Sequence, residues 1–203
     1  MVEDPTRPRT EAPPEPPIAD PAPIGLTAFA LTTFVLSCVN AGLVSESILQ
    51  TFVPLAFFYG GLTQLLAGLF ELRNRNMFGA TAFCGYGAFW ISLGFLVFFQ
   101  GRLGLTEETL PIALGLTLLG WTIFTFIMWI GSFGLNVALA VVFTLLLATF
   151  ALLTIGELGG AASLRHLGGY VGIATAIAAW YTAAAEVMND TYGRKVLPLG
   201  ERG

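Results

Sequence analysis

Charged side chains are scarce in this sequence. Only 11% of its 203 residues are Asp, Glu, Lys or Arg, whereas 55% are hydrophobic and 13% are aromatic. Soluble globular domains carry about 25% charged residues, so the composition excludes that class and favours an integral membrane protein. The formal net charge of −4 is small and gives no indication of a nucleic-acid partner.

Cysteine and histidine are also rare, which bears on metal sites and on catalysis. Cys38 and Cys84 both lie inside apolar runs, without the spacing of metal ligands or of a secreted disulfide framework. The single histidine, His166, follows Arg165 in a short loop and belongs to no recognisable nucleophile motif. HExxH, P-loop and dinucleotide fingerprints are all missing from the sequence. We therefore expect no enzyme activity, no metal site and no cofactor.

Long apolar runs are what the sequence has in abundance. Six uncharged segments each approach the roughly 20 residues that an α-helix needs to cross the hydrocarbon core of a membrane. They are residues 25–43, 48–70, 77–99, 110–130, 134–156 and 167–185. None alternates in polarity as the strands of a membrane β-barrel do. The sequence predicts an all-α, multi-pass protein of the cell membrane with six transmembrane helices.

The chain divides into three parts by composition. Residues 1–19 are crowded with proline and mixed charge, so we expect a disordered tail. Residues 20–190 form the predicted six-helix domain, and residues 191–203 form a short C-terminal tail. With six spans, seven of the nine basic residues lie on the side that carries both termini. The positive-inside rule then places the N- and C-termini in the cytoplasm.

Small and polar residues follow one face of several predicted helices. Residues three or four apart share a face of a helix, and small residues on such a face let helices pack closely. The stripes are Phe29/Thr33/Leu36/Asn40, Gly60/Gln64/Ala67/Glu71, Thr81/Gly85/Ala88/Ser92, Leu146/Phe150/Leu153/Glu157 and Gly168/Gly172/Thr175/Ala179/Thr182/Glu186.

Three polar side chains within the runs are harder to attribute to packing. Asn40, Gln64 and Tyr86 lie in three successive predicted helices. Polar groups at membrane depth cost free energy unless they are satisfied, so they tend to face partners or a wet cavity. Each one alone fits an interhelical hydrogen bond equally well. Together they favour a polar pathway through the helix bundle.

Three carboxylates lie at or near the ends of predicted helices. Glu71, Glu157 and Glu186 could be solvated there by the membrane interface, with no role in transport. The alternative is that one of them carries a proton during transport. The sequence alone leaves both interpretations open.

The segment at residues 20–26 marks the start of the membrane domain. It reads Asp-Pro-Ala-Pro-Ile-Gly-Leu. Pro21 and Pro23 lack an N–H donor and prevent a helix from running into this segment from upstream. Asp20 is placed to cap the helix that follows. The segment is either an ordinary helix start or one opening of a pathway.

These residues carry a resemblance to a known family. The chain resembles the acetate uptake transporter family, whose members open with Asn-Pro-Ala-Pro-Leu-Gly-Leu; here the first and fifth positions differ. The similarity continues through Phe-Tyr-Gly-Gly-Leu-Thr-Gln at residues 58–64 and is densest at residues 76–90. It resumes at Gly120-Trp121 and closes with Leu197-Pro198, and so covers residues 20–200. Asp20 in place of asparagine bears on any role that needs an uncharged amide.

The resemblance implies a six-helix protomer with its own pore, assembled as a homo-hexamer in the lipid bilayer. Its substrates would be acetate and related small carboxylates, including succinate, and transport would be coupled to protons. The residues that the resemblance and the stripes assign to the pathway are Phe29, Tyr86 and Leu146 for the constriction, Asn40, Gln64 and Thr33 for its lining, and Ala179 for substrate size. The entry motif comprises Asp20, Pro21, Ala22, Pro23 and Gly25, and the candidate proton carriers are Glu186, Glu157 and Glu71.

Two other functions remain open at this point. One is a pore for small neutral solutes such as urea or amides, because such channels can share a six-helix, hexameric plan. The other is a membrane sensor or scaffold that transports nothing, in which case the polar stripes would be filled and sealed.

Overall fold

The computed structural model describes residues 18–201 and is all-helical apart from one isolated bridge between Asn136 and Glu201. Six helical spans are long and apolar enough to cross a membrane. Five of them are single helices: α1 (Ala22–Asn40), α4 (Met77–Phe99), α5 (Thr109–Ser132), α6 (Val137–Leu158) and α7 (Ala162–Tyr192). The second span is composite and runs through η1 (Glu46–Ile48), α2 (Leu49–Pro54), η2 (Leu55–Thr63) and α3 (Gln64–Arg73).

The prediction of six transmembrane helices is confirmed, and the third span has the predicted bounds. Each of the other five spans differs from its predicted bounds at both ends. The first helix begins at Ala22 rather than Gly25, because Pro23 lies in the first turn, where its missing N–H needs no partner. The last helix extends to Tyr192, beyond the apolar run. Residues 1–19 are predicted to be disordered. Of these, residues 1–17 lie outside the part of the chain that the structure describes.

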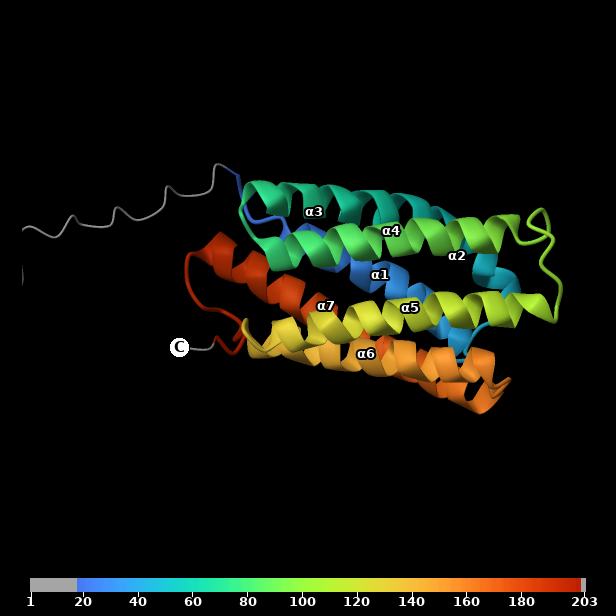
Figure 1. Ribbon diagram of the computed structural model, residues 1–203. Helices are drawn as coiled ribbons and strands as arrows, with labels where there is room; N and C mark the ends of the chain where they lie inside the picture. Colours follow the sequence, from blue (N-terminus) through green and yellow to red (C-terminus); the bar gives the residue numbers. More distant parts are fainter. Residues whose placement is uncertain (1–17, 202–203) are drawn as a thin grey trace, which may run out of the picture.

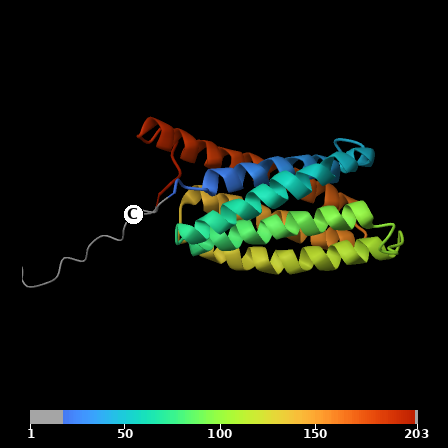
Figure 2. The same cartoon turned by 90° about the horizontal axis from the view of Figure 1, so that it is seen from above.

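The six spans form a ring around a common centre. Helix α1 packs against α7 and against η2 and α3, while α7 packs against α6, and α6 against α5. Helix α4 lies beside α3 and η2 and closes the ring toward α5. Figures 1 and 2 show the helices running side by side, with both ends of the described chain at the same end of the bundle. We call this the termini side and the opposite end the loop side.

The second span contains a nine-residue π-helix, η2. It follows directly on Pro54, which lacks the N–H that an α-helix would use. The hydroxyl of Thr63 donates to the carbonyl of Phe58, five residues earlier, at 3.0 Å. A π turn holds more residues than an α turn, so the register of the buried face shifts along the span. After this shift, Gln64 and Glu71 are both buried.

Close backbone approach and interhelical hydrogen bonds hold the spans together. A Cβ at Gly60 would lie 2.6 Å from Thr32 Oγ1 of α1, so the lack of a side chain at Gly60 makes room for Thr32 and lets the two spans pack closely. The hydroxyls of Thr149 and Thr175 lie 3.1 Å apart and link α6 to α7. Such bonds contribute about 0.6 kcal/mol each in membrane proteins, so the ring depends mainly on packing.

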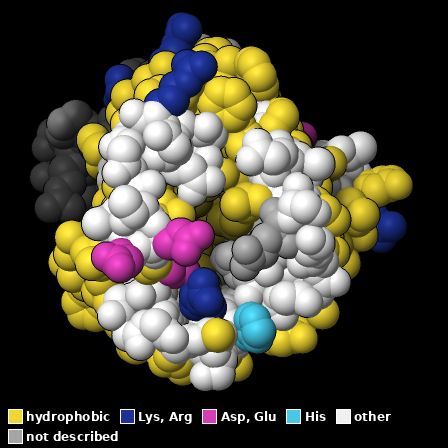
Figure 3. Space-filling view, turned by 90° about the vertical axis from the view of Figure 1, so that its right-hand side faces the viewer, with side chains coloured by type: hydrophobic (Ala, Val, Ile, Leu, Met, Phe, Trp, Pro, Cys, Tyr) yellow, Lys and Arg dark blue, Asp and Glu magenta, His cyan; other side chains and the backbone are white. Residues whose placement is uncertain are grey.

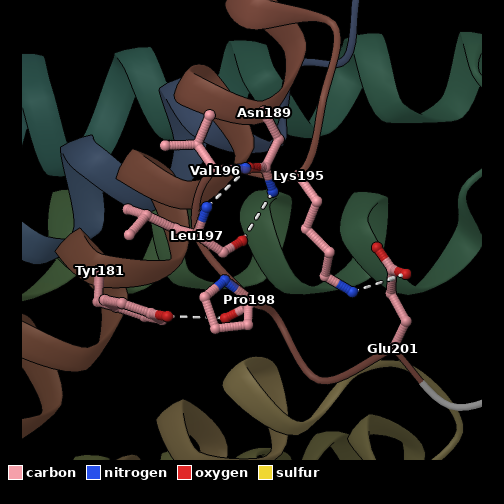
Figure 4. A network of polar contacts seen from close by, with 7 residues as sticks. All are labelled: Tyr181, Asn189, Lys195, Val196, Leu197, Pro198 and Glu201. Atoms are coloured by element: carbon pink, nitrogen blue, oxygen red, sulfur yellow. Dashed lines mark hydrogen bonds and ion pairs between the residues drawn. The ribbon is translucent and has the colours of Figure 1, made fainter.

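The C-terminal segment, residues 194–201, turns back over the bundle as a strap (Figure 4). Asn189 Oδ1 accepts the N–H groups of Val196 and Leu197, at 2.6 and 3.0 Å. Its Nδ2 donates to the carbonyl of Leu197 at 2.9 Å, and Tyr181 donates its hydroxyl to the carbonyl of Pro198 at 2.7 Å. The strap is therefore fixed to the last turns of α7.

The far end of the strap caps helix α6. The N–H groups of Val137 and Ala138 donate to the carbonyls of Gly200 and Leu199, both at 3.0 Å. The first N–H groups of a helix have no partner within the helix, so the strap satisfies two of them. An ion pair of 3.2 Å joins Lys195 to Glu201 and closes the strap on itself (Figure 4).

Candidate functional site

The larger of two cavities inside the ring lies toward the termini side. It has a volume of about 340 Å³ and is lined by α1, α3, α4, α6, α7 and the strap. Its polar lining comprises Asp20, Gln64, Glu71, Asn76, Asn136, Glu186 and Glu201.

Four carboxylates and no basic side chain occur among the described residues that line this termini-side cavity. Gln64 and Glu71 are each 1% exposed. Gln64 Oε1, Glu71 Oε1 and Glu186 Oε2 are buried and have no hydrogen-bond partner in the described part of the chain. Unpaired acceptors of this kind call for a donor, which a proton, a water molecule or a protonated ligand can supply.

Three helices begin at this cavity and oppose its negative charge. Helix α1 begins at Ala22, directly after the N-cap residue Pro21. Asp20, the residue before Pro21, accepts the N–H of Ala22 with its Oδ1 at 2.9 Å. Asn76 caps α4 and Asn136 caps α6, accepting N–H groups at 3.0 and 2.8 Å. The N-terminus of a helix carries a partial positive charge, so the three ends favour anions at this side of the bundle.

The second cavity, of about 130 Å³, lies toward the loop side. Every member of two predicted stripes lines it. The stripes are Phe29/Thr33/Leu36/Asn40 of α1 and Leu146/Phe150/Leu153/Glu157 of α6. Glu157 pairs with Arg165 at 3.7 Å, so its charge is compensated. Figure 3 looks onto this end of the bundle, which is hollowed near its centre, with acidic, basic and histidine side chains close to the hollow.

Phe29 and Leu146 line both cavities, and Tyr86 lines the termini-side cavity beside them. All three side chains are 2–4% exposed and come from α1, α6 and α4. The ring centroids of Phe29 and Tyr86 lie 5.9 Å apart, and Phe150 stacks on Tyr86 at 6.4 Å. The structure thus places the three residues predicted for a constriction together, at the boundary between the two cavities.

The hydroxyl of Tyr86 is engaged with another helix. It lies 3.0 Å from Thr125 Oγ1 of α5, in a fully buried contact. In this contact either oxygen can be the donor. The physical role of the contact is to fix the ring of Tyr86, which is also packed edge-on against Phe124 at 5.3 Å.

Comparison of the sequence with models of known protein families assigns the chain to a family. The model described as the GPR1/FUN34/yaaH family matches residues 3–198. The chain belongs to this family, the acetate uptake transporters. The resemblance inferred from the sequence is thereby confirmed.

Relatives of this chain include named transport proteins. The succinate-acetate/proton symporter SatP of Escherichia coli (strain K12) is 40% identical over 184 residues, which cover 91% of this chain and 96% of the relative. Acetate permease A of Emericella nidulans is 40% identical over 195 residues, covering 89% of this chain and 65% of the relative. Ammonia transport outward protein 2 of Saccharomyces cerevisiae is 42% identical over 173 residues, covering 83% and 61%.

A solved structure supports the fold. The bacterial acetate channel SatP matches with a TM-score of 0.83 and 39% sequence identity, over 90% of this chain and 99% of that chain. This GPR1/FUN34/yaaH protein is therefore a multi-pass membrane protein of a transporter and channel family and not an enzyme.

Several predicted residues lie away from both cavities. Ala179 is fully buried in the packing of α7 and lines neither of the two cavities. Gly25 gives space to the ring of Phe83, and Pro21 and Pro23 form the start of α1. Thr81, Ala88 and Ser92 of the third stripe are exposed on the outside of α4, and the two hydroxyls bond to carbonyls of their own helix.

Sequence reasoning missed Trp90, Asn76, Asn136 and Glu201, which also line the cavities. The two asparagines follow a recognisable signal, because each precedes a helix and accepts an N–H three residues later. Glu201 reaches the termini-side cavity only because the strap folds back, and the sequence has no local pattern that indicates this.

Proposed function

We propose that this chain conducts acetate and related small carboxylates, including succinate, through the middle of the protomer. The observation that carries the proposal is the meeting of the two cavities at Phe29 and Leu146. An apolar boundary between two cavities that carry some polar groups resists wetting and slows inorganic ions, whereas a small amphiphilic acid can pass. The substrates of the relatives SatP, a succinate-acetate/proton symporter, and acetate permease A agree with this substrate class.

The pathway in this proposal runs from the strap to the outer loops. Helix N-termini attract the anion at the termini side, Gln64 lies below the constriction, and Thr33 and Asn40 lie above it. The excess of basic residues on the termini side supports a cytoplasmic location for both termini. Ala179, buried behind the cavities, would act on substrate size only through the packing of α7.

Proton coupling is assigned in this proposal to Glu71 and Glu186. Both line the termini-side cavity, and each has an oxygen without a partner among the described residues. Glu157 is a weaker candidate because Arg165 pairs with it. Assembly as a homo-hexamer stays part of the proposal on the strength of the family resemblance.

The experiment that tests the proposal is solute uptake by purified protein in liposomes. We expect saturable entry of radiolabelled acetate above that of protein-free liposomes, with inhibition by succinate and no uptake of radiolabelled urea. Uptake of urea without acetate would instead support a pore for neutral solutes. Absence of both, in protein that is correctly assembled, would favour a sensor or scaffold.

A further inference from the structure

Two residues that line the loop-side cavity each carry a buried donor group without a partner among the described residues. Trp90 is 3% exposed and Thr33 is 4% exposed, and both line this cavity. Among the described residues, neither Trp90 Nε1 nor Thr33 Oγ1 has a hydrogen-bond partner. Buried polar groups are almost always paired, so two unpaired donors beside one cavity indicate a ligand with acceptor atoms.

Comparable side chains elsewhere in the bundle are satisfied. Trp129 donates its indole N–H to Thr144 Oγ1 at 2.9 Å. Thr32, the residue before Thr33, donates to the carbonyl of Ala28 at 2.9 Å. Buried threonines in helices usually bond to a carbonyl one turn earlier, as Thr32 does. Trp90 and Thr33 therefore differ from a tryptophan and a threonine of the same bundle whose donors are satisfied.

The two donors lie at one level of the bundle. Thr33 is four residues after Phe29 on α1, and Trp90 is four residues after Tyr86 on α4. Both helices run from the termini side to the loop side, so each donor lies about 6 Å beyond the constriction. Glu157 is eleven residues beyond Leu146 on α6, or about 16 Å, and is paired with Arg165. Its charge is therefore remote from the two donors.

We propose that the Trp90 indole N–H and the Thr33 hydroxyl bind the carboxylate group of the substrate directly on the loop side of the constriction. This site rests on the proposed function, which it deepens by naming the groups that recognise the acid. A carboxylate has only acceptor atoms, so two donors without acceptors suit it. The unpaired buried atoms of the termini-side cavity are oxygens of Gln64, Glu71 and Glu186, and an ionised Glu71 or Glu186 would repel the same group.

The indole is held in place before any ligand arrives. The ring of Trp90 packs against those of Phe89, Phe52 and Phe29, with centroids 4.8, 5.7 and 6.4 Å away. Because the ring cannot turn freely, little freedom is lost when its N–H binds an anion. Phe29 and Leu146 at the base of the cavity provide an apolar surface for the alkyl part of the acid.

The site can be observed directly by labelling the four tryptophans with ¹⁵N and recording their indole N–H signals in detergent or nanodiscs. Spectra of Trp90→Phe and Trp129→Phe assign two of these signals. We expect sodium acetate to move the Trp90 signal in a saturable manner and to leave the Trp129 signal unchanged. Sodium chloride at equal concentration should have no effect on either.

Transport provides the second test. Trp90→Phe and Thr33→Val should each raise the acetate concentration for half-maximal uptake about tenfold, the value for one hydrogen bond to a charged group. Trp129→Phe and Thr32→Val are the matched controls and should leave it unchanged.

The outcomes separate the site from the proposed function. A Trp90 signal that ignores acetate at concentrations that saturate uptake overturns the site and leaves the function intact. A signal that moves equally with chloride also overturns it. A signal that moves with acetate in protein that transports no acetate supports the site and contradicts the function. If Trp90→Phe does not fold, the spectra of Trp121→Phe, Trp129→Phe and Trp180→Phe assign the other three signals, and the fourth belongs to Trp90.

Discussion

The hydroxyl of Tyr86 lies 3.0 Å from the hydroxyl of Thr125, and this contact ties the constriction to a helix that contributes no residue to it. Tyr86 is on α4 and Thr125 on α5, two helices whose backbones approach at few points and that are joined mainly by side chains, such as Phe124 against Tyr86. The ring that narrows the pathway is thus held at its tip by this bond and on its faces by neighbouring aromatic rings.

The first prediction concerns this bond. Thr125→Val leaves the Tyr86 hydroxyl buried without a partner and should lower the free energy of unfolding by about 1 kcal/mol. Tyr86→Phe combined with Thr125→Val removes both hydroxyls and should recover most of that loss. Thermal unfolding in detergent of the two single variants and the double variant measures the coupling. Strictly additive losses would show that the two hydroxyls do not interact.

The second prediction concerns the width of the constriction. Leu146→Ala and Phe29→Ala remove side chains that separate the cavities, so the flux of succinate or lactate relative to acetate should rise about tenfold. Competition uptake in liposomes measures the ratio. Met128→Ala is the control, because Met128 is buried in α5 and lines neither of the two cavities. This variant should lower the free energy of unfolding by about 2–5 kcal/mol, as such truncations usually do, without changing the flux of succinate or lactate relative to acetate.

Selectivity that is unchanged in both variants, at normal protein levels, would remove Leu146 and Phe29 from the pathway.

The third prediction concerns proton coupling. Glu186→Gln and Glu71→Gln keep the size of the side chain but cannot bind and release a proton. Both should retain downhill acetate exchange and lose the additional accumulation that an inward proton gradient drives. Parallel uptake with and without a pH gradient measures this. Glu108→Gln, in an exposed loop position before α5, should behave as the unmodified protein. Gradient-driven accumulation in both cavity variants would assign the proton to another group or to the acid itself.

The fourth prediction concerns the strap. Asn189→Ala removes the acceptor for two N–H groups and the donor to Leu197, so the strap should detach. Trypsin should then cleave after Arg194 or Lys195 several times faster in detergent-solubilised protein. Asn189→Asp keeps the acceptor oxygen and should cleave at a rate close to that of the unmodified protein. Equal cleavage of all three proteins would mean that other contacts fix the strap.

The sequence predicts the spans well because hydropathy and length determine them. The buried stripes of α1 and α6 are also readable, since both helices keep a regular α-helical spacing past Phe29 and Leu146. On α4, however, the stripe through Thr81 and Ser92 contains small polar residues and still faces outward. Threonine and serine satisfy their hydroxyls on their own helix, so their polarity does not identify the inner face.

Other features depend on contacts between distant segments. The partner of Tyr86 is 39 residues away on α5, and no periodicity indicates which of several threonines it will be. The π-helix after Pro54 changes the register of the second span, which a regular 3.6-residue count does not anticipate. In the sequence Trp90 cannot be told from other apolar aromatic residues, and only its lack of a hydrogen-bond partner within the described chain distinguishes it.

The central claim is that small carboxylates pass between the two cavities at Leu146 and Phe29. Acetate uptake by liposomes that contain Leu146→Trp tests it most directly, with elution as an assembled protein in size-exclusion chromatography as the check on folding. A tryptophan at this position adds a large ring to a boundary that is already buried, so the account predicts uptake no higher than in protein-free liposomes. Acetate uptake at the rate of the unmodified protein, by a Leu146→Trp variant that elutes normally, would contradict it.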